Sequence, residues 1–268
     1  MGHYIEVEKN IKLFVEDIGE GQPVIFLHGW PLNHKMYEYQ MNEIPQQGYR
    51  FIGIDFRGYG KSDKPLKGYD YKTMANDVRA VIDALDLQNA VLAGFSMGGP
   101  IAATYMIEHK EHQISKLMLL SAAAPSFTQQ DGFSYGMKPS EVDELIEGIQ
   151  KDRPAALAEF GSTFFGQSIS KEFEMWFGNL GLEASSYGTL ASAKALRDED
   201  LRTKLSSITV PTLLLHGRKD EICPFEFAEQ MQQEISQAEL IPFEHSGHGL
   251  FYDEKEKFNK EILAFLDK

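Results

Sequence analysis

The sequence predicts an α/β domain with a mostly parallel sheet that helices cover on both faces. Short apolar runs, such as residues 23–27 and 116–120, are typical of strands buried on both faces. Segments with apolar residues at helical spacing separate these runs, and this alternation is typical of β-α-β units. Because ligands of such sheets bind at the carboxyl ends of the strands, we expect the functional residues at that edge.

The composition indicates one domain with a small-molecule partner. A chain of 268 residues is long enough to bury one full core. Its formal net charge of −14 disfavours binding to nucleic acid or to an anionic membrane surface, because both attract clustered Lys and Arg.

Three features predict a cytoplasmic protein. Cys223 is the only cysteine, which excludes an internal disulfide and a cysteine-rich metal site and fits a reducing compartment. Residues 1–8 lack the basic and apolar regions of a signal peptide. The apolar runs are too short to span a bilayer, so we expect no membrane contact.

The first half of the chain begins with a predicted edge hairpin. Residues 3–8 and 11–18 alternate between apolar and polar side chains, as in antiparallel strands at the edge of a sheet. Thr73 is a suitable N-cap for a helix that ends at about Leu85. The other elements predicted here are strands over 23–27 and 49–54 and a helix over 34–47.

The pattern changes after residue 125. Residues 126–200 lack apolar strand-like runs and contain helical segments with scattered aromatic side chains. We therefore predict a helical cap over 126–200, inserted into a core domain of residues 1–125 and 201–268. The sheet pattern then resumes, with strands over 213–216 and 238–241 and helices over 224–235 and 254–266.

Residues 94–98, Gly-Phe-Ser-Met-Gly, have the pattern of a nucleophile elbow centred on Ser96. The pattern predicts a strand, a tight turn with a strained serine, and a helix that Met97 and Gly98 open. We expect the Ser96 hydroxyl to project into solvent, with the N–H groups of the helix N-terminus pointing toward it. A plain turn is the alternative, because short Gly-x-Ser-x-Gly patterns also occur by chance.

A serine nucleophile needs a base and an acid, and two later loops offer them. Asp220 follows the strand at 213–216; Glu221 is its rival, although its side chain should point the other way. His248 lies between two glycines after the last strand, and His245 is the competing histidine. We expect five further histidines at the surface or in ordinary packing: His3, His34, His109, His112 and His216.

The predicted oxyanion hole combines the backbone N–H of Met97 with that of Trp30, in the loop after the strand at 23–27. His28 is expected to brace this loop.

The segment Gly60-Lys61-Ser62 is similar to the end of a phosphate-binding loop. Such a loop needs a glycine five positions before Gly60, where Asp55 stands, and a helix directly after it. We therefore expect a compact turn in which Asp55 and Arg57 hydrogen-bond to the backbone.

With these motifs, the chain resembles the cofactor-free haloperoxidase and aryl-esterase group of the α/β-hydrolase superfamily over nearly its full length. The resemblance rests on His28-Gly29-Trp30-Pro31-Leu32, residues 55–63, residues 94–99, residues 216–220 with Pro224, and His248-Gly249. The order Ser96, Asp220, His248 along the chain is the order of this superfamily. The resemblance implies the α/β-hydrolase fold, an eight-stranded, mostly parallel twisted sheet with helices on both faces and a helical cap.

In function, the resemblance implies a carboxylesterase or aryl esterase that uses Ser96, Asp220 and His248 as catalytic residues and forms an acyl-enzyme on Ser96. It also implies a perhydrolase activity, in which hydrogen peroxide accepts the acyl group. Neither a metal nor a haem nor another cofactor is implied. The partner is a small-molecule ester, and because similar proteins often form dimers or trimers, a homo-oligomer is also suggested.

Aromatic side chains dominate the expected substrate pocket. Of the many aromatic residues in the cap, we expect only Phe127, Phe160 and Phe164 to touch the substrate. Pro31 fixes the local backbone, and we hypothesise that it turns the Trp30 carbonyl toward the pocket, where bound peroxide would donate a hydrogen bond to it. The resemblance implies a pocket lined by Trp30, Phe95, Met97, Phe127, Phe160, Phe164 and Ile222.

Other activities remain open. Lactonase, lactamase, other amide hydrolase and carbon–carbon hydrolase reactions use the same triad, and only the pocket decides between them. Serine at position 96 argues against haloalkane dehalogenases and epoxide hydrolases of this fold, which use a carboxylate there. A hydrolase-like protein that binds a ligand without turnover is the non-enzymatic alternative. Residues 181–184 and 191–192 are smaller than in similar proteins, so no acyl size is predicted.

Overall fold

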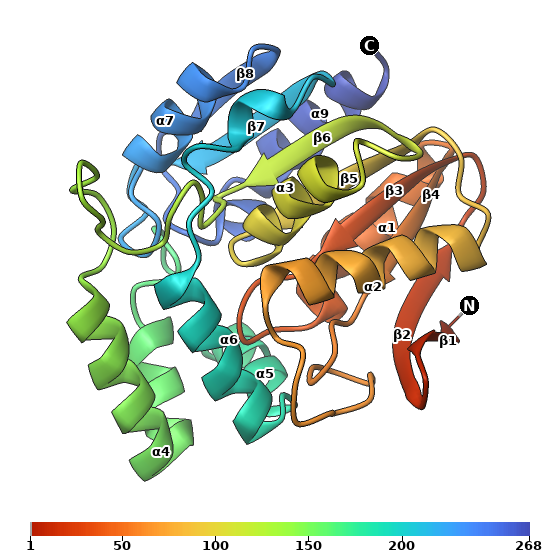
Figure 1. Cartoon of the computed structure of the whole chain (residues 1–268). Helices are drawn as coiled ribbons and strands as arrows, with labels where there is room; N and C mark the ends of the chain where they lie inside the picture. Colours follow the sequence, from red (N-terminus) through yellow and green to blue (C-terminus); the bar gives the residue numbers. More distant parts are fainter. Residues whose placement is uncertain (1) are drawn as a thin grey trace.

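One eight-stranded sheet forms the centre of the computed structural model, which describes residues 2–268 (Figure 1). In order across the sheet, the strands are β1 (Gly2–Glu8), β2 (Ile11–Ile18), β4 (Tyr49–Ile54), β3 (Gln22–Leu27), β5 (Ala90–Phe95), β6 (Ile114–Leu120), β7 (Thr212–Gly217) and β8 (Ala238–Phe243). β2 pairs in antiparallel orientation with both β1 and β4, and every other neighbouring pair is parallel. The predictions of a mostly parallel sheet and of an edge hairpin are confirmed.

Helices cover both faces of this sheet (Figure 1). On one face α2 (Tyr71–Ala84) packs against α3 (Gly98–Glu108), and on the other α1 (Glu38–Gln46) contacts α9 (Lys255–Leu266). α7 (Glu226–Glu234) packs against β7 and β8. Every residue of β5 and of β7 is buried, as expected for central strands that have helices on both sides.

Three helix boundaries differ from the prediction. The segment 34–47 begins with a 3-10 turn, η1 (His34–Tyr37), before α1. α2 begins at Tyr71 because the N-cap is Asp70, whose carboxylate accepts a hydrogen bond from Thr73 N at 2.8 Å; Thr73 is not the cap. A short helix, α8 (Leu250–Asp253), precedes α9 and was not predicted, because four residues are too few to show a periodic stripe.

The predicted cap region contains three helices, α4 (Pro139–Gly161), α5 (Lys171–Leu182) and α6 (Ser186–Asp198), which lie beyond the carboxyl ends of the central strands (Figure 1). α4 contacts both α5 and α6, and it bends at Asp152, two residues before Pro154. After α6, a 3-10 turn, η2 (Leu205–Ser207), leads back to β7. The three helices therefore lie over the sheet edge where the predicted catalytic residues stand, while the exact limits of the cap stay a prediction.

Candidate active site

Ser96 lies at a sharp turn between β5 and α3. Its φ of +50° is unusual for a side chain other than glycine. A Cβ atom at Gly94 would lie 2.2 Å from Gly98 O, and one at Gly98 would lie 2.5 Å from Leu27 O. Both flanking glycines are therefore required by the close approach of β5, α3 and the end of β3, which is the local structure that the elbow pattern predicts.

The Ser96 side chain is less accessible than predicted. The residue is only 8% exposed, so little of it reaches solvent, although the elbow pattern predicts a hydroxyl that projects into solvent. The sequence pattern of the elbow describes the strand, turn and helix, and it does not show which other segments pack beside them. The aromatic ring of Phe164, for example, lies over this edge and contacts the His248 ring at 4.9 Å between ring centres.

Asp220 and His248 form a buried pair at the carboxyl ends of β7 and β8. His248 Nδ1 donates to Asp220 Oδ2 at 2.8 Å, and the two side chains are almost fully buried. Asp220 Oδ1 accepts two backbone hydrogen bonds, from Ile222 N at 2.9 Å and from Cys223 N at 2.8 Å. The rival residues Glu221 and His245 are both exposed.

The environment of Asp220 keeps it ionised. Burial alone would raise the pKa of its carboxyl group, but the positive charge that His248 carries when it is protonated, together with the hydrogen bonds from His248 and the backbone, outweighs burial and holds this pKa below its usual value. A carboxylate only accepts hydrogen bonds, so His248 carries its proton on Nδ1 and leaves Nε2 free to act as a base.

His216, which was expected at the surface or in ordinary packing, is a buried neighbour of this pair. Its Nε2 donates to Cys223 O at 2.7 Å and lies 3.5 Å from Asp220 Oδ2. Burial lowers the pKa of His216, so the imidazole is neutral. It therefore helps to hold the loop that presents Asp220. The sequence feature that could have indicated this role is the position of His216 near the end of β7, four residues before Asp220.

Within residues 2–268, Ser96 Oγ forms no hydrogen bond with the His248 ring. The two residues are linked through Phe95, the neighbour of Ser96, whose ring centre lies 4.8 Å from that of His248. In unliganded catalytic sites the contact between nucleophile and base is often long, and it shortens when substrate binds. The roles of Ser96 and His248 thus stay predictions at this point.

The loop after β3 brings Trp30 to the serine. A Cβ atom at Gly29 would lie 3.0 Å from Ser96 Cβ, so this loop touches the elbow. In the described part of the chain, the backbone N–H groups of Trp30 and Met97 donate to no protein acceptor. Two free N–H groups beside the serine are the arrangement that an oxyanion hole requires.

As predicted, His28 braces this loop. Its Nε2 accepts a hydrogen bond from Phe56 N at 3.0 Å, and its Nδ1 donates to Gly29 O at 2.9 Å. Burial lowers the pKa of His28 to about 4, so the ring is neutral and has one donor and one acceptor for these two contacts.

The turn that follows β4 is structural. The Asp55 carboxylate accepts hydrogen bonds from His34 N at 2.8 Å, His34 Nδ1 at 2.7 Å and Lys61 N at 2.9 Å, which confirms its predicted contact with the backbone. Arg57 also makes its predicted backbone contact, donating to Lys67 O at 3.4 Å, but its main partner is the Asp77 carboxylate, bound through two hydrogen bonds of 2.7 Å. His34, also expected at the surface or in packing, belongs to this buried network.

The predicted pocket residues fall into two groups. Trp30, Phe127 and Phe160 line one small cavity, and Trp30, Pro31, Phe160 and Phe164 line a second. Phe95, Met97 and Ile222 are buried and line neither of these cavities. The Trp30 indole is fixed by its hydrogen bond to Thr189 O at 2.9 Å and by edge-on packing against Phe160.

Residues 22–255 match the protein family described as alpha/beta hydrolase fold. The chain belongs to this family.

Similar proteins show to which group of the family this α/β hydrolase belongs. It is 61% identical over 265 residues to the AB hydrolase superfamily protein YisY of Bacillus subtilis (strain 168), with 99% of each chain covered. It is 32% identical to the non-heme chloroperoxidase CPO-A1 of Kitasatospora aureofaciens, with 96% of this chain and 97% of the relative covered. The solved structure of an esterase, EaEST, from Exiguobacterium antarcticum is similar with a TM-score of 0.99 and 54% identity over the whole of both chains. The hydrolase therefore lies in the esterase and non-haem haloperoxidase group.

No group of three or more His, Cys, Asp or Glu side chains between residues 2 and 268 is placed to hold a metal ion. Over the same residues, no helix is both long and apolar enough to cross a membrane.

Proposed function

We propose that this α/β hydrolase cleaves carboxylic esters through an acyl-enzyme on Ser96, with His248 as general base and acid and Asp220 as the residue that orients His248. The observation that carries the proposal is the buried Asp220–His248 hydrogen bond of 2.8 Å at the sheet edge where Ser96 occupies its strained turn. The esterase and non-heme chloroperoxidase among its relatives support the same reaction class.

The first half of the reaction forms the acyl-enzyme. Ser96 Oγ attacks the ester carbonyl carbon while His248 Nε2 takes the hydroxyl proton. The negative charge on the carbonyl oxygen is stabilised by the N–H groups of Trp30 and Met97, which donate to no acceptor among residues 2–268. The carbon–oxygen bond to the alcohol then breaks, and His248 returns the proton to the departing alcohol oxygen.

The second half releases the acyl group. Water attacks the acyl carbon while His248 takes one of its protons; the bond between this carbon and Ser96 Oγ then breaks, and His248 returns the proton to Ser96 Oγ. The products are a carboxylic acid and free Ser96. Hydrogen peroxide in place of water gives a peracid by the same proton transfers, and we propose it as a second acceptor. The ionised Asp220 stabilises the imidazolium that forms in each half.

A panel of p-nitrophenyl and phenyl esters of rising acyl length, measured with and without hydrogen peroxide, tests this function. We expect turnover of esters with release of the phenol, and formation of peracid when peroxide is present. The panel also contains a lactone, an anilide and a vinylogous 1,5-diketone, because the same triad serves those reactions. Turnover of only one of these, with no ester cleaved, would contradict the proposal; no turnover of any compound would favour a ligand-binding protein.

Replacement of Pro31 tests the role of peroxide. Pro31 lines the cavity next to Trp30, where the proposed hydrogen bond from peroxide to the Trp30 carbonyl would form. We expect Pro31→Leu to lower the ratio of peracid formation to ester hydrolysis by roughly 2- to 10-fold, the effect of one lost hydrogen bond. The ratio corrects for any general loss of activity. A ratio equal to that of the wild type would contradict the proposed hydrogen bond from peroxide to the Trp30 carbonyl.

We also propose that the enzyme works in the cytoplasm. Support comes from Cys223, a fully buried thiol whose pKa is raised by burial and which has no second cysteine with which to form a disulfide. Fractionation of the producing cells, followed by esterase assays of the fractions, tests this location.

A further inference from the structure

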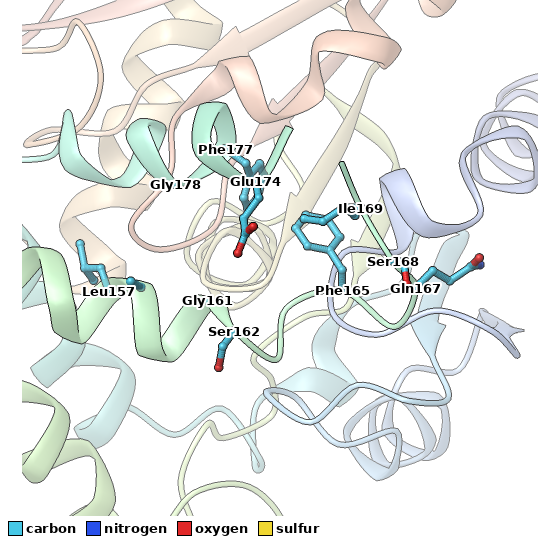
Figure 2. Close-up of a pocket in the computed structure, with 11 residues that line it drawn as sticks. Leu157, Gly161, Ser162, Phe165, Gln167, Ser168, Ile169, Glu174, Phe177 and Gly178 are labelled. Carbon is cyan, nitrogen blue, oxygen red and sulfur yellow. The ribbon is translucent and has the colours of Figure 1, made fainter. Parts of the chain in front are cut away.

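The cap contains an open cavity of about 400 Å³ to which the proposed reaction assigns no role. It lies between α4, α5 and the loop that joins them. Figure 2 shows Leu157 and Gly161 on α4 across from Glu174 and Gly178 on α5, with Phe165 of the joining loop at one end. A volume of this size is typical of sites that bind small organic molecules.

This cavity adjoins the smaller one beside the candidate active site. The two cavities share four lining residues: Leu157, Gly161, Phe177 and Gly178. The smaller cavity, of about 50 Å³, is also lined by Trp30, Pro31 and Phe164. The two adjoining cavities are here named the cap channel; the larger opens at the surface of the cap and the smaller reaches the oxyanion loop.

Two glycines leave room in the wall of the cap channel. A Cβ atom at Gly161 or at Gly178 would meet no neighbouring atom within 4 Å. Glycine inside a helix such as α5 costs about 1 kcal/mol relative to alanine, and no crowding at Gly178 requires it. The absence of these two side chains therefore has one clear structural effect, which is to keep the channel wide.

The chemistry of the wall indicates what passes through it. The smaller cavity is lined mainly by apolar side chains, whereas the larger one combines apolar side chains with the uncharged polar residues Ser162, Gln167 and Ser168. Glu174 is the only charged residue that lines the channel in the described chain. Its carboxylate has no ion-pair or hydrogen-bond partner among those residues. An unpaired negative charge at the mouth repels anions, so the channel suits an uncharged apolar group.

The other side of Trp30 offers little space. The cavity there, lined by Phe127 and Phe160 among others, holds about 10 Å³, which is room for one water molecule at most. An ester has an acyl arm on one side of the scissile bond and an alcohol arm on the other. The small cavity has room only for a short arm, so a long arm would have to lie in the cap channel.

We propose that the cap channel binds the alcohol arm of the substrate, and that the preferred class is acetate-like esters of long, uncharged, apolar alcohols. This inference rests on the proposed ester hydrolysis. The departing alcohol receives its proton from His248, so it must leave on the His248 side of the site. Phe164 places the channel on that side, because its ring contacts the His248 ring and also lines the channel.

The test compares n-hexyl acetate with ethyl acetate in wild type and in two variants from opposite walls, Gly178→Leu and Gly161→Leu. We expect the ratio of kcat/KM for the hexyl ester to that for the ethyl ester to fall about 10-fold or more in each, because the added side chain displaces several buried methylene groups. Asn179→Leu adds the same side chain at the next position of α5, borders neither cavity of the channel, and should keep the wild-type ratio. Gly178→Ala, with thermal unfolding as a check of folding, should give an intermediate ratio.

Two results separate this inference from the function on which it rests. A wild-type enzyme that cleaves neither acetate would overturn the proposed function and this inference with it. Cleavage of both acetates, with the same ratio in wild type and in the folded Gly178 and Gly161 variants, would overturn the channel assignment alone. A series of ethyl esters from acetate to hexanoate checks the direction: rates should fall with acyl length, and a preference for hexanoate that Gly178→Leu removes would assign the channel to the acyl arm instead.

Discussion

Replacement of Ser96 by alanine should lower kcat/KM for p-nitrophenyl acetate by about 10⁵-fold, because the acyl-enzyme can no longer form. The substitution removes one oxygen atom from a turn held by backbone hydrogen bonds, including Ser96 N to Leu120 O at 3.0 Å, so the fold should be retained. A weak residual rate is expected, since the oxyanion N–H groups still stabilise attack by water.

Ser121→Ala is the matched control for this variant. Ser121 follows β6, the strand next to β5, has a positive φ of 39°, and carries a buried hydroxyl without a partner in the described chain. It shares the backbone strain of Ser96 but has no assigned role, so its activity should stay near that of wild type. A Ser96→Ala enzyme as active as the Ser121→Ala enzyme would show that another residue is the nucleophile.

Asp220→Asn should lower kcat/KM by about 10⁴-fold while leaving thermal stability nearly unchanged. The N–H groups of Ile222 and Cys223 both bind Oδ1, so the amide oxygen of the asparagine will take that place and its NH₂ group will face His248. His248 Nδ1 must then accept a hydrogen bond, which puts the ring proton on Nε2 and removes the base that Ser96 needs.

Glu221 provides the matched control for Asp220. Glu221→Gln changes the neighbouring exposed carboxylate and should leave both rate and stability unaltered. If Asp220→Asn lost stability and rate together, with the residual activity following the folded fraction, Asp220 would be a structural residue of the loop and not the partner of a catalytic base. Thermal unfolding curves and initial rates on the same samples distinguish these outcomes.

Local patterns in the sequence were sufficient for most of the sheet and for the elbow. Buried strands such as β3 are continuous apolar runs, and the glycines around Ser96 are required by contacts within a few residues and with the adjacent strand end. The sequence was sufficient to predict that Asp220 and His248 lie close together, because each follows a strand and the carboxyl ends of parallel strands meet at the same edge of the sheet.

The features that the sequence did not reveal depend on contacts between distant segments. Arg57 binds the backbone at Lys67 O as expected, but the sequence did not reveal its stronger partner, Asp77, which comes from the next helix. His216 looks like an ordinary strand residue until the loop of Cys223 folds back onto it. The burial of Ser96 likewise depends on segments outside the elbow, such as the loop that contains Gly29.

The cap channel is the clearest example of a feature that local sequence patterns do not reveal. Gly161 and Gly178 are ordinary residues of helical segments in the sequence, and only the packing of α4 against α5 shows that they face a shared space. The size of the acyl group was equally inaccessible to sequence reasoning, because the small cavity beside Trp30 is closed by side chains from the loop before α4, from α4 itself and from α6.

The most direct test of the account is labelling with a fluorophosphonate at neutral pH, followed by intact mass measurement and peptide mapping. The account predicts one label per chain, on Ser96, and loss of labelling in both Ser96→Ala and His248→Ala. A label on any other residue, or an unlabelled but folded wild-type protein, would contradict the assignment of Ser96 as a nucleophile activated by His248.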